Sequence, residues 1–344
     1  CDPYGTAMTL RPDGRSIVTD TPRGFSDDKW MQSRTKCFDK PMNIYEVHAG
    51  SWRQKEDGSW YTYAELAELL PAYCKENGFT HIELMPLAEH PFDGSWGYQI
   101  TGFFAPTSRY GTPQDFMYFV DKLHRAGIGV IMDVVYNHMY RYENVLNNTV
   151  PDYFFRQNED GSLSNGSGCG NEFASERPMV RKFIVDSVLY WAKTYHIDGF
   201  RFDLMALEDV DTMNAIRAAL DSLPGGESIL LYGEPWMGGG TNLEGGARPA
   251  DKRALDALSD RIGFFCDDTR DCIKGNVFDA ANAGYVNGAP QHGYDVIHSI
   301  SAWRNGAHGF WPRRAGQVVQ YVSAHDNYTR WDKLAAVARR GDYD

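Results

Sequence analysis

The feature that most constrains the fold of this chain is the alternation of apolar, strand-like runs with amphipathic, helix-like segments. Seven apolar runs follow one another: NIYEVHA (43–49), THIELMPL (80–87), IGVIMDVVY (128–136), DGFRFDLM (198–205), SILLYGEPW (228–236), IGFFCDD (262–268) and VVQYVSAHD (318–326). Amphipathic segments at 63–78, 112–127 and 175–196 precede the second, third and fourth runs. Strands that are apolar on both faces and alternate with helices indicate a parallel sheet covered by helices.

Two architectures build such a sheet, an open doubly wound sheet and a closed barrel. The open sheet is the weaker alternative, because no G-x-G-x-x-G motif follows the first run. We therefore expect an α/β fold of the TIM (β/α)8 barrel class, in which active residues lie at the carboxyl ends of the strands. Only seven runs are present, so the barrel is expected to be truncated before its eighth strand.

Two segments lie outside this repeat. Residues 1–40 are rich in turn sequences such as DPYG, RPDG and TPRG, and we expect a linker or the tail of a preceding β domain there. Residues 41–344 are expected to form the barrel. Within them, residues 139–175 are rich in Asn, Gly and Ser, which predicts an inserted subdomain after the third strand, where long loops often shape a substrate cleft.

Composition excludes several classes of partner. The chain has 34 Lys and Arg against 46 Asp and Glu, a net charge of −12, which argues against nucleic acid. No run approaches the ~20 apolar residues of a membrane span, so no membrane partner is expected, and the absence of an export signal favours the cytoplasm. Aromatic residues make up 14% of the chain, which suits ligands such as sugars that stack on rings. The six cysteines form no C-x-x-C pair, so we expect reduced thiols and no metal site built from them.

Polar residues gather at the ends of four of the runs. Arg201 and Asp203 share one face of the fourth run because side chains two residues apart on a strand point the same way. Three carboxylates, Asp203, Glu234 and Asp326, are expected to converge above the barrel. Glycoside hydrolysis needs such carboxylates, one as nucleophile or base and another as general acid.

Other residues near these run ends supply groups that could contact a sugar. Arg201 would hold Asp203 ionised. We expect hydrogen bonds to sugar hydroxyls from His138 and His325, and stacking faces from Trp96, Tyr98 and Trp236. Taken singly, an Arg–Asp pair on a strand is structural more often than not, and one GEPW motif indicates little. Four clusters at the same end of four strands favour function instead.

These motifs resemble a known family. DVVYNH, DGFRFDLM, GEPW and VSAHDN are similar, in order and spacing, to the four signature regions of the alpha-amylase superfamily, glycoside hydrolase family 13. The resemblance covers roughly residues 40 to 340. It implies a retaining mechanism with Asp203 as nucleophile, Glu234 as general acid/base and Asp326 as the carboxylate that stabilises the transition state. The resemblance also implies supporting positions for Asp133, His138, Arg201 and His325, and a stacking position for Tyr98. Asn137 matches a calcium ligand of many amylases, so no cofactor is expected beyond a structural calcium ion.

Two stretches of the chain resemble different members of that superfamily. The stretch from DPYGTAMTL to PFDGSWGYQITGFFAPTSRYGTPQDF is similar to glycogen branching enzymes, and the stretch from SNGSGCGNEF to YVSAHDNYTRWDKL is similar to type I pullulanases. The catalytic motifs fall in the second stretch, which favours a debranching hydrolase that cleaves α-1,6 bonds of pullulan, glycogen or amylopectin-type α-glucans. A 1,4-alpha-glucan branching transferase is the alternative. A third hypothesis, a non-catalytic glycan-binding barrel, is disfavoured because all three carboxylates are present.

Overall fold

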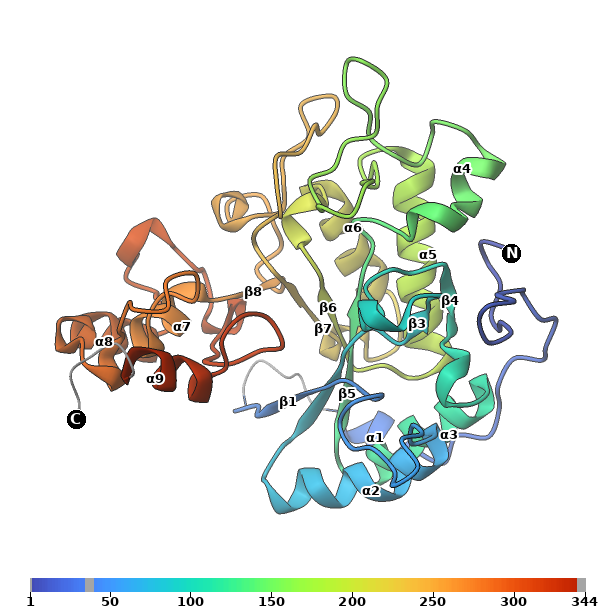
Figure 1. Ribbon diagram of the computed structural model, residues 1–344, viewed down its shortest axis with the longest axis horizontal. Coiled ribbons are helices and arrows are strands. Elements are labelled where there is room, and N and C mark those ends of the chain that lie inside the picture. The colour runs from blue at the N-terminus through green and yellow to red at the C-terminus, as the bar shows by residue number, and fades with distance from the viewer. Residues whose placement is uncertain (1, 35–39, 339–344) are drawn as a thin grey trace. The chain divides into compact units, whose positions relative to one another are not determined.

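The computed structural model describes residues 2–34 and 40–338, which fall into two compact units, Cys1–Ala254 and Leu255–Asp344 (Figure 1). The strands of the first unit are β1 (Ile44–Val47), β2 (His81–Leu84), β3 (Ala88–Glu89), β4 (Gly102–Pro106), β5 (Gly129–Val134), β6 (Gly199–Phe202) and β7 (Leu230–Gly233). Its helices are α1 (Asp28–Ser33), α2 (Tyr63–Glu76), α3 (Pro113–Arg125), α4 (Val145–Thr149), α5 (Pro178–Thr194) and α6 (Val210–Asp221).

Five of these strands form a parallel sheet in the order β1, β2, β5, β6, β7. Each lies inside one of the predicted apolar runs. The strands follow one another in chain order, and α2, α3, α5 and α6 lie in the connections between them. This is the arrangement of a (β/α) barrel, in which each strand is followed by a helix that returns the chain to the start of the next strand.

One hydrogen bond shows that the sheet curls. The hydroxyl of Tyr232 on β7 donates to the carboxylate of Glu83 on β2, although β5 and β6 lie between these strands. Neighbouring strands are about 4.8 Å apart, so β2 and β7 would be separated by roughly 14 Å in a flat sheet, with both side chains perpendicular to it. The two side chains meet because the sheet bends around an interior, which confirms the expected barrel fold.

The sequence determines where the main helices begin and end. Thr62 and Thr112 each form a capping box that starts α2 and α3, and Pro178 occupies the first turn of α5. Gly78 and Gly127 follow the ends of α2 and α3 with φ of +70° and +78°. These left-handed conformations are the ones expected of glycine just past a helix end.

The inserted segment after β5 is built around a buried cation. Arg156 is fully buried, and its guanidinium pairs with Glu172 at 2.8 Å and Glu176 at 2.7 Å. The rings of Phe155 and Phe173 pack beside it with centroids 5.1 Å apart. This cluster also contacts the barrel, because Arg156 donates to the backbone oxygen of Leu207 and Phe173 packs against Phe103 on β4. The inserted subdomain stays a prediction.

Two features were not expected from the sequence. β3 and β4 form a separate antiparallel pair. This pair was not expected, because the run GFFAP of β4 was not recognised as a strand. Residues 25–34 also pack on the barrel: α1 lies there, and the indole of Trp30 donates to Asp198 at 2.9 Å. The proposed division at residues 40 and 41 stays a prediction, and residues 35–39 lie outside the described part of the chain.

The second unit contains the last two predicted runs. Its strands β8 (Gly263–Phe265) and β9 (Val318–Val319) pair in parallel, and its helices are α7 (Asp267–Lys274), α8 (Gly293–Ile300) and α9 (Arg330–Ala338). Within residues 2–34 and 40–338 no eighth parallel strand follows β9, in line with the truncated barrel expected from the runs.

Two further expectations concern the environment of the chain. Cys74, Cys169, Cys266 and Cys272 are reduced thiols, as expected, whereas Cys1 and Cys37 lie outside the described residues. Among the helices that the structure describes, none combines the length and apolar character that crossing a bilayer requires. The cytoplasmic location stays a prediction.

Candidate active site

A single buried guanidinium organises the carboxyl ends of β5, β6 and β7. Arg201 contacts Asp133 at 3.1 Å and Asp203 at 3.2 Å through Nη1, and Glu234 at 2.6 Å through Nη2. Asp133 and Arg201 are register partners on β5 and β6, so their side chains leave the sheet on the same face. The structure therefore brings together two of the three predicted carboxylates, Asp203 and Glu234, with two predicted supporting residues.

The charges of this cluster support one another. Burial alone would lower the pKa of Arg201, but the negative charges of Asp133, Glu234 and Asp203 outweigh it and raise that pKa above its usual value. Arg201 is therefore a permanent cation. Asp203 keeps 13% of its side chain exposed, whereas Asp133 is fully enclosed. Asp203 is therefore the most exposed of the three carboxylates, ahead of Glu234, whose side chain is 5% exposed.

Asn137 and His138 fix the opposite side of Asp203. The amide of Asn137 donates to the Asp203 carboxylate at 2.9 Å and to its backbone oxygen at 2.8 Å. The Oδ1 atom of Asn137 lies 2.5 Å from Nδ1 of His138, and Nε2 of His138 lies 3.1 Å from the amide nitrogen of Gln99. Burial lowers the pKa of His138 in spite of the nearby Asp203 charge, so the ring is neutral at pH 7.

Glu234 is held by the backbone that follows Asp203. The N–H of Leu204 donates to the Glu234 carboxylate at 2.8 Å, and Leu204 adopts a left-handed conformation with φ of 40°. β6 ends at Phe202. The alternation of side chains that was expected along the whole run therefore does not continue to Leu204. A Cβ atom on Gly233 would lie 2.6 Å from the backbone oxygen of Phe202. The glycine of the GEPW motif is thus needed for the close approach of β7 to β6.

Tyr98 approaches the cluster from the loop between β3 and β4. Its hydroxyl donates to Asp133 at 2.6 Å, and burial together with the Asp133 charge raises the pKa of Tyr98 well above its usual value. Gly97 precedes it with φ of +96°, and a Cβ atom there would lie 2.2 Å from the backbone oxygen of Pro86. The glycine in SWGY allows the loop to bring the phenol down to the strand ends.

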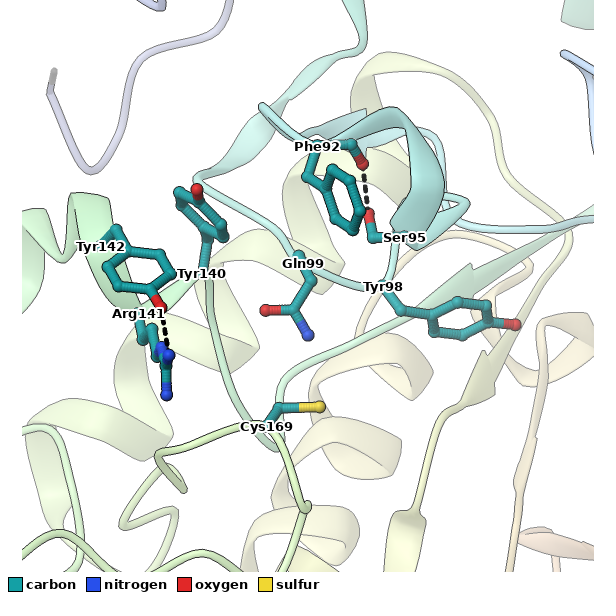
Figure 2. A pocket seen from close by; sticks show the side chains of 8 residues that line it. All are labelled: Phe92, Ser95, Tyr98, Gln99, Tyr140, Arg141, Tyr142 and Cys169. Atoms are coloured by element: carbon teal, nitrogen blue, oxygen red, sulfur yellow. Dashed lines mark hydrogen bonds between the residues drawn. The ribbon is translucent and has the colours of Figure 1, made fainter.

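A cavity of about 320 Å³ lies beside Tyr98. Figure 2 shows the rings of Phe92, Tyr140 and Tyr142 along its margin, Cys169 across from them, and Gln99 between. The lining is mainly aromatic, and the Phe92 and Tyr142 side chains are 56% and 70% exposed. Such rings offer flat apolar faces of the kind on which a sugar can stack.

The remaining predicted residues are His325, Asp326, Trp236 and Trp96. His325 and Asp326 belong to the second unit, where His325 Nε2 lies 3.6 Å from Asp326 Oδ1 and the Asp326 side chain is 66% exposed. Trp236 is half-buried two residues after Glu234, and Trp96 is 46% exposed. The convergence of Asp326 with Asp203 and Glu234 stays a prediction.

A calcium site at Asn137 does not fit the contacts that surround this residue. Both atoms of its side-chain amide are engaged, the nitrogen by Asp203 and the oxygen by His138. In residues 2–34 and 40–338 no group of three or more His, Cys, Asp or Glu side chains is arranged to hold a metal ion. We therefore assign Asn137 to the positioning of Asp203 and derive no step through calcium.

Three contacts of the site were not predicted from the sequence: Gln99 with His138, Leu204 with Glu234, and Asn137 with Asp203. The signal for Asn137 was present, because it directly follows an apolar run next to His138. The Gln99 contact joins residues 39 positions apart, and the Leu204 contact depends on a backbone conformation that strand periodicity does not reveal.

Comparison with known proteins identifies the class of barrel. A family profile described as "Alpha amylase, catalytic domain" matches residues 62–172. A pullulanase from Bacillus subtilis strain 168 is 41% identical over 97% of this chain and 50% of its own length. A 1,4-alpha-glucan branching enzyme from Fusobacterium nucleatum is 45% identical over 60% of this chain and 34% of its own length. The chain belongs to the alpha-amylase family.

Within that family, pullulanases match nearly the whole chain. The crystal structure of a pullulanase from Paenibacillus barengoltzii, complexed with maltohexaose and alpha-cyclodextrin, superposes with a TM-score of 0.86 and 31% identity. It covers 99% of this chain and 57% of the crystallised one. The type I pullulanase of Bacillus subtilis, complexed with maltose, gives 0.85 and 33% identity, covering 99% and 51%. The chain thus spans about half the length of these pullulanases.

Proposed function

We propose that this chain carries the catalytic machinery of a retaining α-glucan hydrolase of the pullulanase type, which cleaves α-1,6 bonds. The observation that carries the chemistry is the single guanidinium of Arg201, which joins Asp203 and Glu234. Two carboxyl groups that contact the same guanidinium lie close to each other, which is compatible with the ~5–5.5 Å carboxyl separation of retaining glycosidases. The proposed substrate is an α-glucan, in keeping with the maltooligosaccharides bound to the similar pullulanases.

In the proposed first step, the Asp203 carboxylate attacks the anomeric carbon while Glu234 donates its proton to the departing glycosidic oxygen. The bond from the anomeric carbon to that oxygen breaks, and an ester bond to Asp203 forms. Asn137 and Arg201 hold Asp203 from two sides, so its lone pair is oriented before the sugar arrives. Asp326 is proposed to bind sugar hydroxyls and stabilise this transition state.

In the second step, water hydrolyses the ester, and Glu234 accepts the proton of that water. Esterification removes the negative charge of Asp203, so the positive charge of Arg201 is then shared by Glu234 and Asp133 alone. An opposite charge close by favours the ionised form of a carboxyl group. The same guanidinium therefore favours the base form of Glu234 at the stage when a base is needed.

Two candidate activities share this chemistry and differ in what attacks the ester. Water gives debranching, whereas a sugar hydroxyl gives branching. Debranching is supported by pullulanase matches that cover 97–99% of the chain. Branching is the second candidate because branching enzymes are 45–47% identical over 60% of it.

The products formed from pullulan, analysed by chromatography beside linear amylose, test the proposal. Maltotriose released from pullulan, with amylose unchanged, is the expected result. Amylose that gains α-1,6 branches while pullulan is untouched would establish the branching activity instead. Glu234→Gln is expected to remove nearly all turnover, since it removes the proton donor. Activity of Glu234→Gln equal to that of an active parent would remove the proposed role of Glu234. A parent chain that binds α-glucan but converts neither pullulan nor amylose would leave the non-catalytic glycan-binding barrel as the remaining hypothesis.

A further inference from the structure

Residues 4–17 form a small hairpin that packs on β4, and we call it the 4–17 hairpin. Backbone hydrogen bonds and one antiparallel bridge join its two arms. The ring of Tyr4 lies 4.8 Å from the ring of Phe104 on β4. Met8 is buried, and a Cβ atom on Gly102 of the same strand would lie 2.5 Å from its Sδ atom. The hairpin is therefore fixed on β4, in the same unit as the active-site cluster.

Arg11, at the turn of this hairpin, contacts the loop that carries Tyr98. Its guanidinium pairs with Oδ2 of Asp93 and lies over the ring of Trp60, 5.4 Å from the centroid. The other oxygen, Asp93 Oδ1, accepts from Arg109 Nε at 2.8 Å and from Arg109 Nη2 at 2.6 Å. Burial alone would raise the pKa of Asp93, but the two guanidinium groups outweigh it and lower that pKa. The Asp93 carboxylate is therefore ionised and held from two sides.

Two overlapping turns lead from Asp93 to the active-site cluster. The backbone oxygen of Asp93 accepts from Trp96 N at 3.1 Å, and that of Ser95 accepts from Tyr98 N at 3.0 Å. The Tyr98 hydroxyl then donates to Asp133 at 2.6 Å. A displacement of Asp93 would consequently move the phenol relative to the carboxylate that it contacts.

The conformation of this loop requires support from outside the loop. Trp96 and Gly97 both adopt left-handed conformations, with φ of 55° and 96°. That region is sparsely populated by residues other than glycine, and such residues keep it only where surrounding contacts hold them. Arg11 and Arg109 supply such contacts at the start of the loop, through Asp93.

We propose that Arg11 is a positioning residue for the reaction, which fixes the loop at residues 92–98 and thereby the Tyr98 hydroxyl on Asp133. This inference rests on the proposed function, which gives the cluster around Asp133 its role. Because Arg11 acts through Tyr98, its effect on kcat is limited to the about tenfold expected for Tyr98→Phe. The pair is also partly open to solvent, with Arg11 and Asp93 side chains 31% and 39% exposed, so we expect about a two- to fivefold effect.

Kinetics on pullulan test this role with Arg11→Met, which removes the charge and keeps most of the side-chain length. We expect kcat to fall about two- to fivefold and KM to stay within about twofold, with kcat largely restored in Arg11→Lys. In the Tyr98→Phe background, Arg11→Met should hardly change kcat, because both substitutions act on the same contact. The matched control is Arg15→Met, since Arg15 lies in the same hairpin, is 80% exposed and pairs with Asp13 at 2.9 Å.

Hydrogen exchange measures the support of the loop without turnover. The amides of Trp96 and Tyr98 are bonded within the two turns, so they report on loop opening. Arg11→Met should make both amides exchange about two- to fivefold faster, whereas Arg15→Met should leave their rates unchanged.

The outcomes separate this inference from the proposed function. Pullulan cleavage with the same kcat in Arg11→Met and Arg15→Met overturns the inference and leaves the proposed function standing, even where Arg11→Met lowers the urea midpoint. An equal fall of kcat in the parent and in the Tyr98→Phe background overturns the route through Tyr98. Unchanged exchange of the Trp96 and Tyr98 amides overturns the support of the loop by Arg11. Faster exchange in Arg11→Met, with a parent chain that does not cleave pullulan, keeps that support and overturns the debranching activity.

Discussion

His124 on α3 is expected to make the stability of the first unit depend on pH in the alkaline range. Its ring is completely buried between two carboxylates, with Nδ1 2.7 Å from Asp27 and Nε2 2.8 Å from Asp198. Burial alone would lower the pKa of His124, but these two carboxylates outweigh burial and raise it to about 9. The ring is therefore a cation at pH 7, although its surroundings are closed to solvent.

The size of the effect follows from the two pKa values. An unfolded histidine titrates near 6.5, and each tenfold difference in proton affinity is worth about 1.4 kcal/mol, so the rise to about 9 corresponds to roughly 3 kcal/mol. Because the folded state binds the proton more tightly, this stabilisation is complete below pH 6.5. It is lost as the pH rises from 6.5 through 9.

The assay is urea unfolding of the parent chain and of His124→Gln between pH 6 and 9.5. The free energies of unfolding should differ by about 3 kcal/mol at pH 6 and by less than ~1 kcal/mol at pH 9.5, because the parent loses its advantage. His90→Gln is the control, since burial lowers the pKa of His90 to about 4 and its Nδ1 contacts the backbone oxygen of Ala88, so its ring stays neutral from pH 6 to 9.5. Two parallel curves, with the same difference at every pH, would refute the reasoning.

Three further predictions concern single groups. Asn137→Ala removes two hydrogen bonds to Asp203 and should lower kcat/KM for pullulan about 10- to 100-fold, with the urea midpoint little changed; an unchanged kcat/KM would remove its positioning role. Tyr98→Phe deletes the hydroxyl that contacts Asp133 and keeps the ring, so kcat should fall about tenfold while KM for pullulan stays within twofold; a rise in KM alone would contradict this. Burial raises the pKa of Glu208 from 4.5 to about 8, so its cost to folding grows above pH 4.5 and is complete above pH 8. Glu208→Gln should therefore stabilise the chain by a few kcal/mol at pH 9 and hardly at all at pH 4.5, and an equal gain at both pH values in urea unfolding would contradict it.

Local periodicity explains why the barrel strands could be predicted. The run 128–136 is apolar on both faces and the run 198–205 on one face, and β5 and β6 lie inside them. Parallel strands place their carboxyl ends together, so the neighbourhood of Asp203 and Glu234 followed from the order of the runs. In the first unit, Arg201 contacts both of these carboxylates.

The parts that could not be predicted depend on contacts between distant residues or on backbone geometry. The buried group of Asp27, His124 and Asp198 joins positions up to 171 residues apart, and neither Asp27 nor His124 stands in a recognisable motif. The turn-rich composition of residues 1–40 indicated a linker. Composition alone does not reveal that Asp27 in this segment pairs with the buried His124. β4 was missed since its run GFFAP is short and ends in proline.

The shared counter-ion also has an evolutionary consequence. When all three are ionised, these carboxylates and one guanidinium leave a net charge of −2 at the strand ends, an arrangement that costs stability. A lineage released from selection for catalysis would gain stability by neutralising Asp203 or Glu234, and drift would find that substitution early. Loss of one carboxylate would leave the positive charge of Arg201 to the other two, so the rest of the cluster would be held at least as firmly. All three carboxylates are present in this chain, so selection for stability alone does not account for the cluster.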